Sequence, residues 1–157
     1  MANVRVTRDE YTAEGRQFQK TLEELNKLAC FIGFQYGMRK EKNGADLCNV
    51  AAWNEFGTSR GIPSRPFIRN TVDLHQDEIN QMLDQMAVQV LNGATAEYVL
   101  NQMGSYLKGK MREEITDGEY VPNAPETIRK KGSDQPLIDL GGMYNGVQYQ
   151  IKKKGDL

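Results

Sequence analysis

The chain has 157 residues, of which 39% are hydrophobic and 26% are charged, and its formal net charge is −1 at pH 7. This length suits a single domain over residues 1–157, and the nearly neutral charge excludes a general attraction to nucleic acid or anionic membranes. The longest apolar run, Leu28 to Phe34, is too short to span a bilayer, and residues 1–5 lack a signal-peptide core. We therefore expect no membrane contact and synthesis in the cytoplasm.

The first elements alternate between strand and helix patterns. Valines on either side of an arginine predict a short edge strand at residues 3–8. Apolar residues spaced four, three and four apart predict a helix from about residue 12 to 29. The aromatic and β-branched run at 30–39 predicts a central strand, and Gly33 and Gly37 predict that another part of the protein approaches its second face closely.

Two further helices flank a short loop in the middle of the chain. After a turn at 40–44, a short helix is predicted from about 45 to 56, with Gly57 ending it. Pro66 can begin the next helix, since its missing N–H has no cost in the first turn. A heptad-like apolar stripe predicts that this helix is long and ends at Asn92.

The last third combines a long helix, a long loop and a strand. Apolar residues four apart predict a helix from Thr95 to about residue 116, in which Gly104 and Gly109 predict close packing by another backbone. Residues 118–136 are predicted to form an extended loop, with one turn of helix at 125–130. A half-exposed strand is predicted at 146–153. Together these elements predict an α+β fold: an antiparallel sheet of three or more strands packed against two long helices and shorter ones.

No arrangement of side chains points to catalysis. His75 is the only histidine, and its polar surroundings in a predicted helix are typical of a surface position. Asp134 and Asp139 lack the dense oxygen ligands that calcium requires. Cys30 and Cys48 have no C-x-x-C spacing and are predicted to be buried free thiols. We expect no enzymatic activity, no cofactor and no metal site.

Basic residues form three modest clusters. These are Arg60/Arg65/Arg69, Arg129-Lys130-Lys131 and Lys152-Lys153-Lys154. Each could contact a phosphate backbone, which makes a small nucleic-acid-binding or regulatory protein the alternative function. No aromatic residues are interleaved with them, so we interpret them as solvated faces or subunit salt bridges.

Large apolar groups and arginines gather between Trp53 and Arg69. This segment contains the only tryptophan, two prolines and two phenylalanines. Aromatic residues beside arginines are typical of protein–protein contacts. The sequence therefore indicates binding to other proteins rather than chemistry.

Two sequence signatures resemble the tail-completion (neck) proteins of tailed double-stranded DNA bacteriophages. The first is Val50-Ala51-Ala52-Trp53-Asn54-Glu55-Phe56-Gly57-Thr58 followed by Ile62-Pro63-Ser64-Arg65-Pro66-Phe67-Ile68-Arg69. The second is Pro136-Leu137-Ile138-Asp139-Leu140-Gly141-Gly142-Met143 with a strand after it. The resemblance covers about residues 28–153. Within it, Trp53-Asn54 replace the family's usual aliphatic residue and histidine, and Leu140 replaces threonine.

The resemblance implies a structural virion protein at the head–tail junction. Such a protein forms a ring between the head connector or stopper and the tail terminator or tail tube. The ring, most often six-fold with twelve copies the alternative, surrounds the channel through which DNA passes without sequence-specific recognition. A closed ring needs two different contact patches on each subunit.

The Trp53–Arg69 segment and the 118–142 loop are the candidates for these patches. In this interpretation the aromatic residues pack across subunits and the arginines bind a neighbour's carboxylates or carbonyls. The alternative, left open here, is that the aromatics fill the core and the arginines cap local carbonyls. The interface candidates are Trp53, Glu55, Phe56, Arg60, Arg65, Pro66, Phe67, Arg69, Tyr120, Ile138 and Asp139.

Overall fold

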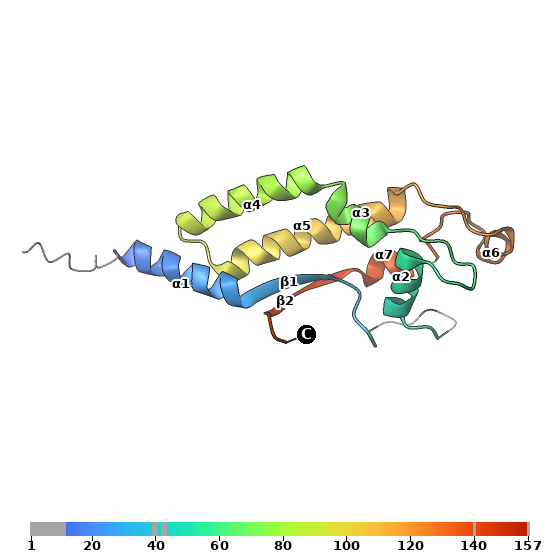
Figure 1. Cartoon of the computed structure of the whole chain (residues 1–157), viewed down its shortest axis with the longest axis horizontal. Helices are drawn as coiled ribbons and strands as arrows, with labels where there is room; N and C mark the ends of the chain where they lie inside the picture. Colours follow the sequence, from blue (N-terminus) through green and yellow to red (C-terminus); the bar gives the residue numbers. More distant parts are fainter. Residues whose placement is uncertain (1–11, 39–40, 42–43, 140, 157) are drawn as a thin grey trace, which may run out of the picture.

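The computed structural model describes residues 12–38, 41, 44–139 and 141–156. The strand predicted at 3–8 lies outside these residues. The described elements, in chain order, are α1 (Ala13–Lys27), β1 (Leu28–Gly33), α2 (Leu47–Phe56), α3 (Phe67–Asp73), α4 (Gln76–Leu91), α5 (Ala96–Asp117), α6 (Pro125–Lys131), α7 (Gly142–Gly146) and β2 (Gln148–Lys153). They form an elongated molecule with α1 at one end and α6 at the other (Figure 1).

The described part of the chain is mostly helical, with a sheet of only two strands, so the predicted sheet of three or more strands is wrong. β1 and β2 pair antiparallel from Leu28 opposite Lys153 to Gly33 opposite Gln148. The strand predicted to reach residue 39 ends at Gly33, whose φ of +144° favours glycine and turns the chain away from the sheet. The segment that follows leaves the sheet instead of extending it.

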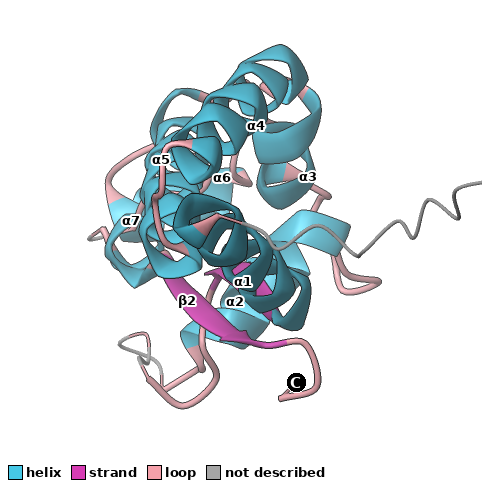
Figure 2. Cartoon of the chain, turned by 90° about the vertical axis from the view of Figure 1, so that its left-hand side faces the viewer, coloured by secondary structure: helices cyan, strands magenta, loops and turns pink. Residues whose placement is uncertain are grey.

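Helix α5 lies along the middle of the molecule and packs on both the sheet and α4 (Figures 1 and 2). Gly104 of α5 lies against the ring of Tyr149 on β2, so close that an added Cβ would lie 2.3 Å from a ring carbon. The close packing predicted at this glycine is real, although it comes from a side chain rather than a backbone. At Gly109 an added Cβ would meet nothing within 4 Å, so the prediction is wrong there.

The long helix predicted from Pro66 to Asn92 is two helices that meet at Leu74 and His75. The break lets α3 and α4 bury residues in different clusters. Phe67 of α3 lies in a cluster near α2 and α7, together with Leu47, Ala51, Met111, Ile115, Leu137, Met143 and Val147. Met86 and Val90 of α4 pack with Val99 and Met103 of α5 at the other end of the molecule. An apolar stripe alone does not distinguish one helix from two at an angle.

The predicted loop 118–136 contains helix α6, which begins at Pro125 as predicted and ends at Gly132 in the left-handed region. A short helix, α7, directly precedes β2, at residues for which the sequence predicted no helix. These segments bring residues 123–139 and helix α7 beside α2 and the loop before α3, at the end of the molecule opposite α1 (Figure 1).

Candidate functional site: a pocket between α2 and α6

A buried carboxylate fixes the angle between α2 and α3. Glu55, in the last turn of α2, is only 2% exposed. Its Oε2 accepts from the backbone N–H of Ile68 at 2.8 Å, and its Oε1 accepts from the backbone N–H of Arg69 at 3.3 Å. These N–H groups lie in the first turn of α3, where the helix itself provides no acceptor. Oε1 also accepts from Nε of Arg69 at 2.8 Å, although the Arg69 side chain is 57% exposed.

A buried guanidinium ties α2 to the loop before α6. Arg65 is 4% exposed, and its Nη1 donates to Oδ1 of Asn54 at 2.8 Å. Its Nε donates to the carbonyl of Val121 at 2.9 Å, and its Nη2 donates to Oδ1 of Asn123 at 3.2 Å and to the carbonyl of Pro122 at 3.3 Å. Since these acceptors are all neutral, burial lowers the pKa of Arg65. Within the single chain, Arg65 therefore follows the alternative left open by the sequence, in which the arginines bind acceptors of their own chain.

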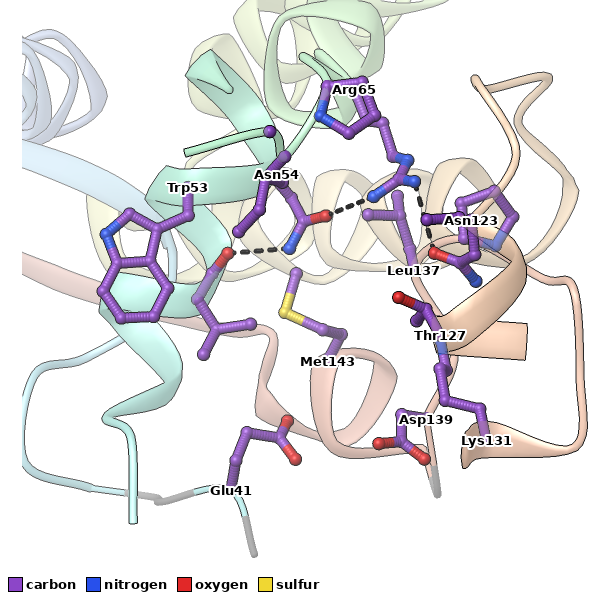
Figure 3. Close-up of a pocket in the computed structure, with 16 residues that line it drawn as sticks. Glu41, Trp53, Asn54, Arg65, Asn123, Thr127, Lys131, Leu137, Asp139 and Met143 are labelled. Atoms are coloured by element: carbon purple, nitrogen blue, oxygen red, sulfur yellow. Dashed lines mark hydrogen bonds between the residues drawn. The ribbon is translucent and has the colours of Figure 1, made fainter. Parts of the chain in front are cut away.

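Beside Arg65 lies an open pocket of about 420 Å³ (Figure 3). Its wall contains residues of both sequence signatures, which are some 70 positions apart in the chain. From the first come Val50, Trp53, Asn54, Ile62, Pro63 and Arg65, and from the second come Pro136, Leu137, Asp139 and Met143. Leu137 and Met143 are buried and form its apolar floor.

Three charged side chains line the side of the pocket away from Arg65. Glu41, Lys131 and Asp139 lie there, as Figure 3 shows. Burial and the negative charge of Asp139 raise the pKa of Glu41, which Lys131 partly offsets. Burial also lowers the pKa of Lys131, despite the two nearby carboxylates. Two carboxylates share one lysine here, so this edge of the pocket favours a positively charged group.

The aromatic residues of α2 are exposed at the surface beside this site. Trp53 is 43% exposed and lines the pocket, while Phe56 is 72% exposed. The guanidinium carbon of Arg69 lies 5.9 Å from the centre of the Phe56 ring, within cation–π range. Arg60 is exposed in the loop between α2 and α3. We call the exposed side chains of Trp53 and Phe56 the Trp53 face.

The other interface candidates lie inside or partly inside the chain. Phe67 is fully buried, and Pro66 and Ile138 are partly buried, with Ile138 packed on the same cluster as Phe67. Tyr120 is partly buried, and its hydroxyl donates to Oε2 of Glu114 at 2.7 Å. Asp139 is exposed at the pocket. The structure thus places the Trp53 face and Asp139 at the surface, and Glu55, Arg65 and Phe67 within the chain.

Sequence reasoning did not identify several residues of the pocket as site residues, among them Glu41, Asn123 and Lys131. Glu41 was assigned only to a turn, Lys131 only to a basic cluster, and Asn123 only to a loop. Asn123 is almost fully buried and donates from Nδ2 to the carbonyl of Gln135 at 3.1 Å, so it links the two ends of the 123–135 segment. A single asparagine in a polar loop gives no sequence signal of this role.

The remaining chemistry-bearing residues lie apart from the pocket. His75 is at the bend between α3 and α4, where Nδ1 is 3.6 Å from Glu78 and Nε2 is 3.9 Å from Glu114. Cys30 and Cys48 are free thiols, as predicted, but are partly rather than fully buried. Among the described residues, no three histidine, cysteine or acidic side chains form a group that could hold a metal ion. No helix in the part of the chain covered by the structure is long and apolar enough to cross a membrane.

Comparison with protein-family models, with curated proteins and with solved structures found no match to this chain.

Proposed function

We propose that this chain is a structural virion protein of the phage head–tail junction, where it forms a ring between the head connector and the tail tube. In this role it has no catalytic activity and no cofactor. DNA passes through the ring without being read. The ring contains six or twelve copies, made in the bacterial host and incorporated into the neck of the particle.

The observation that carries this proposal is the meeting of the two signatures that resemble neck proteins. Described residues from both signatures line one pocket, and the buried Arg65 network holds the chain on both sides of it. A resemblance in two separate segments is more informative when those segments form one surface. The Trp53 face lies at this same surface.

The distribution of apolar side chains supports assembly with other subunits. Among the described residues, thirteen large hydrophobic side chains are exposed, as many as the thirteen hydrophobic residues of the buried core. Five of the exposed ones lie in two separate regions, the Trp53 face near the pocket and Leu83, Val88 and Leu91 on α4, and the other eight are spread over other elements. Two distinct apolar regions are what a ring with heterologous contacts requires.

The solvent-accessible surface area of the chain also agrees with assembly into a ring. The accessible surface of the chain is 11027 Å². A compact monomer of 17.8 kDa would expose about 8,000 Å². The elongated shape of the described residues agrees with a large exposed area, and this surface has room for a contact of about 800 Å² with each of two neighbours.

Sedimentation and native mass measurements test the proposal. We expect the purified chain, alone or mixed with head-connector and tail-tube complexes, to form a closed ring at high concentration. Trp53→Ala combined with Phe56→Ala should weaken assembly while leaving the helical circular dichroism unchanged. Tyr98→Ala, which removes an aromatic residue of similar exposure (54%) on α5, is the matched control. A chain that stays monomeric under all of these conditions would contradict the proposal.

A further inference from the structure

The outer edge of β1 offers unpaired backbone groups. The backbone N–H of Lys154 donates to the carbonyl of Lys27 at 2.9 Å, which makes these two residues a hydrogen-bonded pair in the register of the sheet. Hydrogen-bonded pairs alternate along an antiparallel ladder, so the N–H and C=O groups of Cys30 and Ile32 point away from β2. Within the described ranges, no hydrogen-bond partner is found for these outward groups.

The composition of β1 is that of an interior strand. Its sequence, Leu28-Ala29-Cys30-Phe31-Ile32-Gly33, contains no charged residue and no proline. All six residues are only partly buried. Natural edge strands are usually protected from further pairing by lysine, proline or a bulge, and the described β1 has none of these. An apolar strand without protection is suited to pairing with another strand.

One face of the sheet is also open beside this edge. Tyr149 packs on α5, so its cross-strand neighbour Ile32 faces the helices, while Phe31 and Gln150 face the other way. Phe31 lines an open groove on that side together with Tyr36 and Met38, which are 75% and 70% exposed. The apolar edge therefore continues into an exposed apolar surface.

We propose that the outer edge of β1 pairs with the outer edge of β2 in a second copy of this chain. This inference rests on the proposed ring for the choice of partner. β2 is the other strand with an unpaired edge among the described residues, and it has the same length of six residues. In a cyclic ring all copies have the same orientation to the axis, so β1 of one copy runs antiparallel to β2 of the next.

Charge supports pairing between unlike edges. β2 ends in Lys152 and Lys153, with Lys154 directly after it, whereas β1 brings no charge to the contact. Pairing two β2 edges would bring two lysine clusters into one sheet, and like charges between neighbouring strands are unfavourable. When β2 pairs with β1 instead, the lysine cluster of one copy does not lie opposite the lysine cluster of the next copy.

Hydrogen exchange of the wild-type chain tests the use of this edge. The N–H groups of Cys30 and Ile32 should exchange quickly at dilutions where the chain is monomeric and become strongly protected in the assembled state. The N–H groups of Ala29 and Phe31, which point toward β2, should be protected in both states and are the internal control. Exchange of Cys30 and Ile32 that is unchanged by assembly would overturn the inference.

Disulfide trapping identifies the partner strand. In a Cys30→Ala, Cys48→Ala background, a chain with Phe31→Cys is mixed with a tagged chain that carries Gln150→Cys. Side chains at a non-hydrogen-bonded pair lie on Cα atoms about 4.5 Å apart, within disulfide range. Each chain carries one cysteine, so a disulfide cannot form within a chain. Asp84→Cys, on the exposed side of α4, replaces Phe31→Cys in the control mixture.

The outcomes separate this inference from the proposed function. A mixed disulfide well above the Asp84 control supports pairing of β1 with β2. Predominant Phe31→Cys homodimers would mean that two β1 edges pair, which overturns it. A ring that forms without the mixed disulfide would overturn the inference and leave the proposed function standing. A chain that never assembles would contradict both.

Discussion

Replacing Glu55 by glutamine tests which of its contacts holds α2 and α3 together. The carboxylate serves two kinds of donor: the backbone N–H groups at the start of α3 and the exposed side chain of Arg69. Glutamine keeps the size of the side chain but replaces one oxygen with an NH₂ group. Whichever way the amide turns, this NH₂ faces a donor, either the N–H of Ile68 or the groups of Arg69.

The magnitudes favour the backbone contacts. Losing a buried hydrogen bond to a charged group and leaving its donor unsatisfied costs about 3 kcal/mol. Because the side chain of Arg69 is 57% exposed, its ion pair is screened by solvent and contributes less than about 1 kcal/mol. We therefore expect Glu55→Gln to lower the free energy of unfolding by about 3 kcal/mol, and Arg69→Ala by less than about 1 kcal/mol.

Urea unfolding monitored by tryptophan fluorescence measures both variants. Trp53 is the only tryptophan and lies two residues before Glu55 on α2, so its emission reports this junction. The measurements should be made at one dilute protein concentration, because assembly would add to the apparent stability. If Arg69→Ala costs as much as Glu55→Gln, the ion pair and not the helix cap holds the junction, and the reasoning is refuted.

Three further predictions concern the packing and the ionisable groups. Gly109→Ala should stabilise the chain by up to about 1 kcal/mol in thermal unfolding, whereas Gly104→Ala should destabilise it because its Cβ overlaps the Tyr149 ring; equal effects would contradict this packing. Because the pKa of Glu41 is raised in the folded chain, the stability that its protonated form contributes is lost as the pH rises through that pKa. Glu41→Gln should therefore raise the melting temperature near neutral pH and not in acid. An equal change at both pH values would argue against this. Burial and the hydrogen bond to Glu78 raise the pKa of Tyr106 to about 12. In an ultraviolet titration, the wild type and Tyr106→Phe should therefore show the same tyrosine ionisation near pH 10, and the additional tyrosine of the wild type should ionise only near pH 12. Ionisation of Tyr106 near pH 10 would contradict this.

Local signals in the sequence predicted most of the helices. The apolar spacing of α1 and α5 and the proline that begins α6 act within one element, so they can be read without knowing the fold. The bend at His75 could not be predicted, because it depends on which cluster each end of the apolar stripe joins. The number of strands was wrong for a similar reason: β1 has an interior composition, yet the described chain gives it one partner strand.

The candidate site was predictable only in part. The segment from Trp53 to Arg69 and the second signature drew attention in the sequence, and the structure places both at one pocket. The direction of each side chain was not predictable. Arg65 and Glu55 are turned inward to satisfy backbone groups, while Trp53 is turned outward, and no pattern in the sequence separates these cases.

An image of the phage neck at side-chain resolution tests the central claim most directly. It should contain a closed ring of this chain between the head connector and the tail tube. The Trp53 face should be covered by a neighbouring subunit in that ring. A neck that lacks this chain, or holds it as isolated copies with the Trp53 face exposed, would contradict the account.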